Sequence, residues 1–103
     1  MDTLTIIKVL SNETRFNILE WLKNSEEHFG PQSHLPKDCT FEGGVCVGKI
    51  SEKAGLAQSV ISGYLVKMQK AGLLETKRFG QWTYYRRDEG NIARFKESVR
   101  VGL

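Results

Sequence analysis

Four side chains in the first half of the chain could bind a soft metal ion. They are His28, His34, Cys39 and Cys46. Thiolate and imidazole groups are ligands that zinc and trivalent arsenicals accept. Six residues separate the two cysteines, and this spacing matches no common zinc site. Metal binding is therefore one hypothesis for these residues, with Zn²⁺ or As(III) as an effector and no cofactor required.

The two cysteines admit two further interpretations. Cys46 precedes a predicted helix, and the partial positive charge at a helix N-terminus favours the reactive thiolate. An oxidised Cys46 could then form a disulfide with Cys39 on the neighbouring loop. In the third interpretation Cys46 is a small packed residue and Cys39 has no role, because cysteine often serves only to fill space. The sequence leaves all three interpretations open.

No arrangement typical of an enzyme accompanies these residues. Neither histidine has an evident nucleophile or carboxylate partner, and no phosphate-binding loop occurs. The chain is therefore not expected to be an enzyme. No apolar run approaches the roughly 20 residues that span a bilayer, and no basic apolar leader follows Met1. We expect a cytoplasmic protein in which the cysteines are reduced by default.

Residues 48–87 indicate a different chemistry, the binding of double-stranded DNA. Their pattern is typical of a helix, a tight turn at Gly55, a second helix and a β-hairpin. Residues 49–87 carry eight basic and two acidic side chains, whereas residues 1–48 have a net charge of −3 and residues 88–103 are neutral. Positive charge thus coincides with the segment whose geometry places a helix in a DNA groove, as phosphate binding requires.

The second helix of this motif is predicted at about residues 58–70, and its faces differ in character. Ile61, Leu65 and Met68 form the stripe that should be buried. Short polar side chains on the opposite face could approach base edges closely. The residues expected to face the major groove are Gln58, Ser59, Ser62, Gly63 and Tyr64, and those expected to hold the DNA backbone are Lys67, Lys77, Arg78 and Gln81. Trp82, Tyr84 and Tyr85 are expected to pack within the hairpin.

The segments before this motif are predicted to supply supporting helices. Residues 3–10 are short and apolar, and Asn12 is a suitable N-cap for the helix that follows. Phe16, at helical spacing with Leu19 and Leu22, should belong to the buried stripe of that helix. Residues 25–44 contain both prolines and both histidines, and we interpret them as an irregular insertion.

The chain is expected to end in a helix that packs against another helix. Ile92, Phe95 and Val99 mark one side of this helix, and its partner could come from a second subunit. At 103 residues the chain is long enough for one domain, residues 1–103. The predicted fold class is mainly α, a winged helix-turn-helix with about five helices and a two-stranded β-wing.

The whole pattern resembles the ArsR/SmtB family of small bacterial repressors. VLSNETRFNILEWL is similar to the family's opening helix pair, GLAQSVISGYLVKMQKAGLL to its turn and recognition helix, and RFGQWTYYR to its wing. The resemblance implies a homodimer that binds an inverted-repeat operator and leaves it when an effector binds. It also implies that the first and last helices form the dimer interface, here through Leu4, Ile7, Leu10, Ile92, Phe95 and Val99.

The sequence departs from the family pattern at several of its functional positions. Ala57 stands where a serine often caps the recognition helix, and Gly63 and Tyr64 replace a basic residue and a histidine. Of the family's thiolate pair only Cys46 remains, because Gly48 occupies the second position, and the last helix has no histidine. An alternative of another class is a winged-helix module that binds proteins and not DNA. Its recognition surface would be acidic or apolar, whereas this one is basic and polar.

Overall fold

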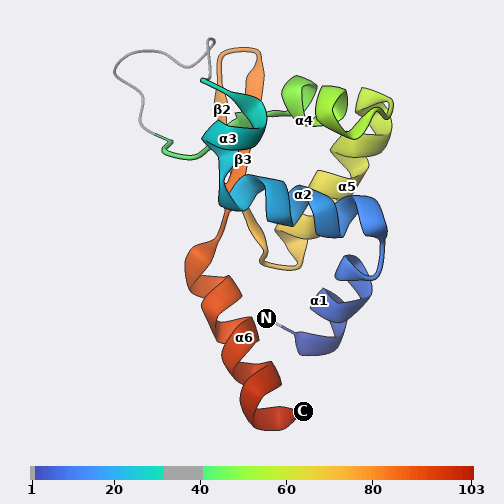
Figure 1. Cartoon of the computed structure of the whole chain (residues 1–103), viewed down its shortest axis with the longest axis vertical. Helices are drawn as coiled ribbons and strands as arrows, with labels where there is room; N and C mark the ends of the chain where they lie inside the picture. Colours follow the sequence, from blue (N-terminus) through green and yellow to red (C-terminus); the bar gives the residue numbers. More distant parts are fainter. Residues whose placement is uncertain (1, 32–40) are drawn as a thin grey trace.

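The computed structural model describes residues 2–31 and 41–103, and in this part of the chain six helices surround a small antiparallel sheet (Figure 1). The helices are α1 (Thr3–Leu10), α2 (Glu13–Lys23), α3 (Ser25–Phe29), α4 (Val47–Ala54), α5 (Gln58–Lys70) and α6 (Glu89–Gly102). The strands are β1 (Val45–Cys46), β2 (Leu74–Phe79) and β3 (Trp82–Arg87). The mainly α winged helix-turn-helix class is confirmed.

Two elements were not predicted, and both lie in or beside the segment expected to be irregular. Residues 25–29 form the short helix α3, so that part of the 25–44 prediction was wrong. The strand β1 pairs with β3, with Cys46 opposite Tyr84, which makes the sheet three-stranded in the order β1-β3-β2. A two-residue strand has no periodicity that a sequence could reveal, because the edge of β3 creates it.

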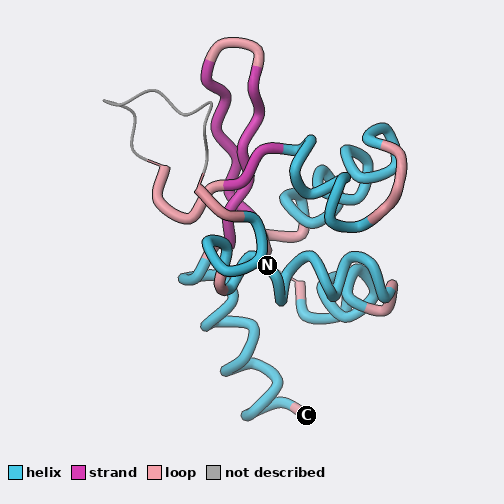
Figure 2. Tube along the Cα trace, turned by 45° about the horizontal axis from the view of Figure 1, so that its top comes forward, coloured by secondary structure: helices cyan, strands magenta, loops and turns pink. Residues whose placement is uncertain are grey.

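The wing is the hairpin of β2 and β3, which projects away from the helices (Figure 2). Its register runs from Leu74 opposite Arg87 to Phe79 opposite Trp82. Gly80 lies in the turn with φ +60°, in the left-handed region that favours glycine, and this allows the tight reversal of the chain.

The core contains residues from the helices and from all three strands of the described part of the chain. Ile61, Leu65 and Met68 of α5 are fully buried, which confirms the predicted stripe, and Ile6 of α1 belongs to the same cluster. Phe16 was predicted to be buried, but it is 46% exposed. Helix α2 instead buries Ile18, Leu19 and Leu22 on the side that packs on the rest of the protomer.

Side-chain caps mark the start of three of the six described helices, α1, α2 and α6. Asn12 accepts the backbone N–H of Arg15 at 3.0 Å, as predicted, and Asp88 accepts that of Asn91 at 3.1 Å at the start of α6. Each bond satisfies one of the N–H groups that a helix start leaves without an intrahelical partner. None of the helices in the described part of the chain has the length and apolar character needed to cross a membrane.

Candidate nucleic-acid interface

The turn between α4 and α5 sets the angle between the two helices of the motif. Gly55 follows α4 with φ +69°, and its N–H donates to the carbonyl oxygens of Ser51 and Glu52 at 3.0 and 3.3 Å. The Ser51 hydroxyl donates to the Leu56 carbonyl oxygen at 2.7 Å and closes the turn. Ala57 occupies the N-cap of α5, and its methyl side chain cannot accept a hydrogen bond from the first N–H groups of the helix.

The exposed side of α5 is mostly polar, although Val66 on the same side is 39% exposed. Gln58, Ser59, Gly63 and Lys67 are exposed, and Ser62 is half-buried beside them. A Cβ placed on Gly63 would meet no heavy atom within 4 Å, so no packing inside the protomer requires glycine there. Lys70, one helical repeat of seven residues after Gly63, is exposed as well. Lys70 was not among the DNA-contacting residues predicted from the sequence, although this seven-residue spacing could have indicated it.

Tyr64 does not share this face. Its ring is half-buried against the core, and the Arg15 guanidinium of α2 lies over it at 5.0 Å from the ring centroid. The ring therefore lies on the flank of α5 nearest α2, while Ser62 lies on the flank nearest the wing. The prediction that Tyr64 faces the major groove stays a prediction.

The wing places its basic and polar side chains at the exposed end of the hairpin. Lys77, Arg78 and Gln81 are all exposed. The Arg78 Nε donates to the Gly80 carbonyl oxygen at 3.0 Å, and the Lys77 ammonium lies 5.4 Å from the centroid of the Phe79 ring. Both contacts are made by the cationic groups themselves and hold them near the strand, and both side chains remain exposed.

The three aromatic residues predicted to pack in the hairpin divide into two groups. Tyr84 and Tyr85 are buried, as predicted, and the Tyr84 ring meets the Phe79 ring edge-on with centroids 5.7 Å apart. Trp82 is instead exposed, at the end of the wing opposite Phe79. Its exposed fraction is 37%, and it lines a cavity together with residues at the start of α4 and α5.

A shallow cavity joins the recognition helix to the wing. Its volume is about 240 Å³, and its walls come from the start of α4, the first turns of α5 and the tip of the wing. The lining residues are Cys46, Val47, Gly48, Gln58, Ser62, Gln81, Trp82 and Thr83. The structure thus brings together Gln58, Ser62 and Gln81, which were predicted separately as groove-facing and backbone-holding residues.

Four of the eight basic side chains in residues 49–87 contact residues more than ten positions away in the chain. Lys49 donates to the carbonyl oxygens of Phe29 and Pro31, both at 3.2 Å, and the Lys53 ammonium lies 5.5 Å from the centroid of the Trp21 ring. The Arg86 Nε donates to the Glu75 carboxylate at 2.8 Å. The Arg87 Nη1 donates to the Leu19 carbonyl oxygen at 3.0 Å.

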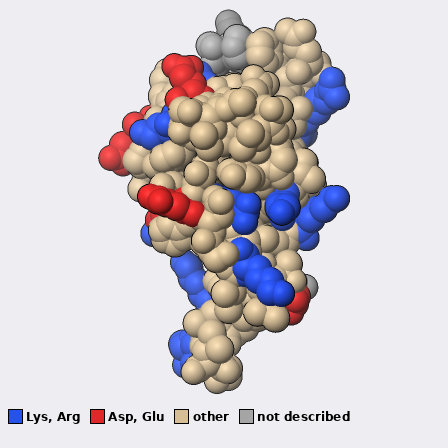
Figure 3. Space-filling model, turned by 90° about the vertical axis from the view of Figure 1, so that its right-hand side faces the viewer, with Lys and Arg blue, Asp and Glu red and all other residues tan. Residues whose placement is uncertain are grey.

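The other four basic side chains of the segment are exposed on α5 and the wing: Lys67, Lys70, Lys77 and Arg78. On the face shown in Figure 3, Lys and Arg side chains form a band across the middle of the molecule, and most acidic side chains lie along one edge. Fewer basic side chains are thus positioned to contact DNA than the eight in residues 49–87 suggested from the sequence.

Cys46 lies where the sheet meets the helix-turn-helix. It ends β1, occupies the N-cap of α4 and is 5% exposed in a small cluster with Phe41 and Tyr84. The Tyr84 hydroxyl is fully buried, with no hydrogen-bond partner among the described residues. Its burial, and to a lesser extent the neighbouring Cys46, raises the pKa of Tyr84 above its usual value.

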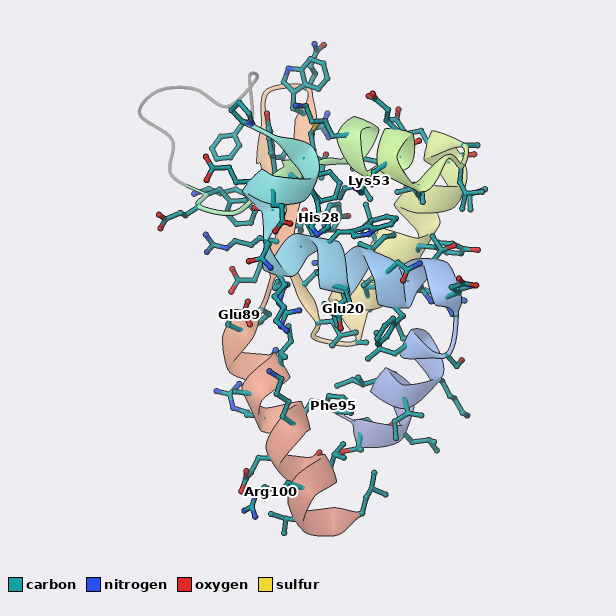
Figure 4. The ribbon with its side chains drawn as sticks, viewed as in Figure 1. Glu20, His28, Lys53, Glu89, Phe95 and Arg100 are labelled. Carbon is teal, nitrogen blue, oxygen red and sulfur yellow. The ribbon has the colours of Figure 1, made fainter. Side chains whose placement is uncertain are left out.

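The structure describes two of the four candidate metal ligands, His28 and Cys46. Cys39 and His34 lie outside the described residues, and His28 is on α3, beside a shallow cavity that Lys53 also lines (Figure 4). No group of three or more metal-binding side chains occurs within residues 2–31 and 41–103. The described residues alone therefore do not assemble the Zn²⁺ or As(III) site considered from the sequence.

The residues predicted to form a dimer interface lie mostly on one surface of α1 and α6. Leu4 is 56% exposed and Ile7 is exposed, while Leu10, Phe95 and Val99 are half-buried. Figure 4 shows Phe95 on the side of α6 that faces α1, and a hydrogen bond of 2.9 Å joins the hydroxyls of Thr3 and Ser98.

Ile92 differs from the other predicted interface residues. It is 4% exposed and belongs to the main core cluster of its own protomer. Val101 in the last turn of α6 and Leu103 directly after the helix are both strongly exposed. The apolar surface therefore lies further along α6 than the sequence indicated.

The helix pair, its turn and the projecting hairpin define a winged helix-turn-helix domain, the architecture of many transcriptional regulators. No family model matches the chain. The HTH-type transcriptional regulator YbzH of Bacillus subtilis is 38% identical over 103 residues, the full length of both chains. The arsenic resistance transcriptional regulator ArsR1 of Pseudomonas putida is 42% identical over 45 residues, which are 44% of this chain and 35% of that protein.

Solved structures agree with these sequence matches. A homodimeric winged helix-turn-helix DNA-binding domain from Mycobacterium bovis, described as a possible ArsR-family transcriptional regulator, superimposes with a TM-score of 0.65 at 26% identity. The match covers 95% of this chain and 74% of that one. The chain belongs to the ArsR family of winged helix-turn-helix transcriptional regulators.

Proposed function

We propose that this regulator is a dimeric repressor that binds an inverted-repeat operator through α5 and the wing. The observation that carries the proposal is the shared cavity, which joins Gln58 and Ser62 of α5 to Gln81 of the wing on one side of the molecule. In this arrangement α5 enters the major groove with Gln58, Ser59, Ser62 and Gly63 toward the bases. Lys67, Lys77, Arg78 and Gln81 hold the sugar-phosphate backbone.

The dimer follows from the unpartnered apolar surface on α1 and α6. Leu4 and Ile7 on α1 and Val101 on α6 expose apolar side chains that a second copy of the chain would cover. A two-fold axis through this surface repeats the reading head and so matches an operator with two related half-sites. The homodimeric neighbour from Mycobacterium bovis supports the same assembly.

The salt dependence of promoter binding tests the DNA interface. Each phosphate contact contributes about −0.9 to the slope of log affinity against log salt, so a Lys67→Ala, Arg78→Ala double variant removes up to two contacts per protomer. For a dimer, which has two copies of each residue, we expect the magnitude of the slope of log affinity against log salt to decrease by about 3.6. Lys53→Ala is the matched control, because Lys53 lies over the Trp21 ring. Unchanged affinity and slope in the double variant would show that α5 and the wing do not face DNA.

We propose further that oxidation of the Cys46 thiol is the signal that releases DNA. A buried thiol is ordinarily inert, but Cys46 also forms part of the wall of the cavity between α5 and the wing. Oxygen added at this position would press between the two elements that hold DNA. Binding of Zn²⁺ or As(III) by Cys46 is the alternative, and its other ligands would have to come from residues such as Cys39 and His34.

A single binding experiment distinguishes these effectors. Fluorescence anisotropy would compare reduced, peroxide-treated, Zn²⁺-loaded and As(III)-loaded protein on a duplex from its own promoter, at one salt concentration. Loss of affinity in the peroxide sample that Cys46→Ser abolishes would support the thiol switch. Loss only with Zn²⁺ or As(III) would support the metal alternative. Equal affinity in all four samples would refute both and leave Cys46 as a packing residue.

A further inference from the structure

Arg15 connects the end of α1 to the middle of the recognition helix. Its Nε donates to the carbonyl oxygen of Val9 at 2.7 Å, and its guanidinium lies over the Tyr64 ring, 5.0 Å from the centroid. The Val9 carbonyl is among the last four of α1, which lack intrahelical partners, so this bond satisfies a group that would otherwise need water. Arg15 is itself held in place, because its backbone N–H donates to Asn12.

Tyr64 receives this contact on the flank of α5 nearest α2, away from the exposed residues around Ser59 and Gly63. The ring packs against the buried core, and the exposed polar face of α5 lies around Ser59 and Gly63. A guanidinium over an aromatic ring is attracted by the negative face of the ring, with an optimum within about 6 Å of the centroid. The contact therefore resists rotation of α5 about its own axis and displacement of α5 from α2.

We infer that Arg15 and Tyr64 are positioning residues that fix the reading helix relative to the dimer surface. The inference rests on the proposed function, since α1 carries the apolar residues Leu4 and Ile7 of the proposed interface. In a two-fold dimer, a change in the angle between α1 and α5 acts twice and alters the separation of the two reading heads. An operator has a fixed separation between its half-sites, so this angle determines whether both heads can bind at once.

Comparing two DNA lengths separates positioning from direct contact. The probes are a labelled duplex of the full operator and a duplex that holds one half-site. Loss of a cation–π contact of ordinary strength corresponds to about a fivefold change in an equilibrium constant. For Arg15→Gln and for Tyr64→Leu we expect about a fivefold loss of affinity on the full operator and less than a twofold loss on the half-site.

Two controls address the competing explanations. Tyr64→Phe keeps the ring and removes the hydroxyl, so it should bind like the wild type if the ring acts through Arg15. The salt slope of Arg15→Gln should equal that of the wild type, because a lost phosphate contact would change it by about 0.9 in each protomer. The double variant Arg15→Gln, Tyr64→Leu should lose no more than either single variant, since both remove the same contact.

The outcomes are distinct. Equal losses on both DNA lengths, or a reduced salt slope for Arg15→Gln, would overturn positioning in favour of direct contact. A loss in Tyr64→Phe as large as in Tyr64→Leu would assign the role to the hydroxyl and also overturn the inference. Unchanged operator affinity in Arg15→Gln, with wild-type protein binding normally, would refute the inference alone. Failure of the wild-type protein to bind its promoter would refute the proposed function and the inference together.

Discussion

Replacing Gly63 with alanine should make the protein more stable and a weaker DNA binder. Gly63 is exposed in the middle of α5, and an added Cβ meets no heavy atom within 4 Å. Helix propensity then acts without opposition, and alanine is about 0.5–1 kcal/mol more favourable than glycine in a helix interior. For a domain of this size, about 1 kcal/mol corresponds to a rise in Tm of roughly 4–8 °C.

The same methyl group lies where the proposed interface brings the α5 backbone against DNA. An extra methyl in a close-packed contact typically costs about 1–3 kcal/mol. At about 1 kcal/mol in each of two protomers, operator affinity would fall about 30-fold. The variant thus improves the folded protomer and impairs the complex, which a general structural defect could not do.

Thermal unfolding by circular dichroism and anisotropy on the promoter duplex measure the two effects separately. Gly90→Ala is the matched control, because Gly90 is exposed in the first turn of α6 and its added Cβ would lie 3.7 Å from an Asp88 carboxylate oxygen, an ordinary contact. We expect it to gain stability and to keep wild-type affinity. If Gly63→Ala binds the operator as tightly as the wild type, the α5 backbone does not approach DNA at this position. A lower Tm would refute the stability argument.

Three further changes test the surfaces and the core. Ile7→Glu places a charge in the exposed apolar surface of α1 and should convert the dimer to monomer in sedimentation equilibrium; a dimer that persists would place the interface elsewhere. Arg87→Gln should lower the free energy of unfolding in urea by about 1–3 kcal/mol, because it removes the hydrogen bond that the largely buried Arg87 guanidinium donates to the Leu19 carbonyl oxygen, whereas the exposed Arg100→Gln should change it little. The pKa of Tyr84 is higher in the folded than in the unfolded protein, so the stability linked to its neutral hydroxyl is complete below about pH 10. This stability is lost as the pH rises through the higher pKa of the folded protein. Tyr84→Phe should therefore lose less stability than the wild type above pH 10. At pH 7 the variant should be at least as stable as the wild type, because the hydroxyl has no hydrogen-bond partner among the described residues. A less stable variant at pH 7 would indicate a hydrogen bond to the hydroxyl.

Local patterns allowed the recognition helix and the N-cap of α2 to be predicted from the sequence. Ile61, Leu65 and Met68 recur at helical spacing, and all three are buried. Asn12 caps α2 through a bond to a residue only three positions away. Such features depend on residues close together in the chain, which is why their spacing alone was sufficient.

Side chains with distant partners could not be assigned in this way. Phe16 has the spacing of a core residue, but the side of α2 that faces the protomer was decided by the packing of the other helices. Lys49 and Arg87 look like DNA-binding cations in the sequence, whereas they bond carbonyl oxygens 20 and 68 residues away. Ile92 matches the apolar stripe of a dimer helix, yet it is buried in its own protomer.

The sequence by itself determined the class of this protein, because the amphipathic period of α5, the turn at Gly55 and the wing turn at Gly80 are local signals of a winged helix-turn-helix. Only the tertiary structure decided which polar residues act together. It brings Gln58, Ser62 and Gln81 to one cavity and places Tyr64 under Arg15 on the other flank of the same helix. The physical reason is that charge and periodicity specify which residues avoid the core, whereas the direction in which they point depends on the elements packed beside them.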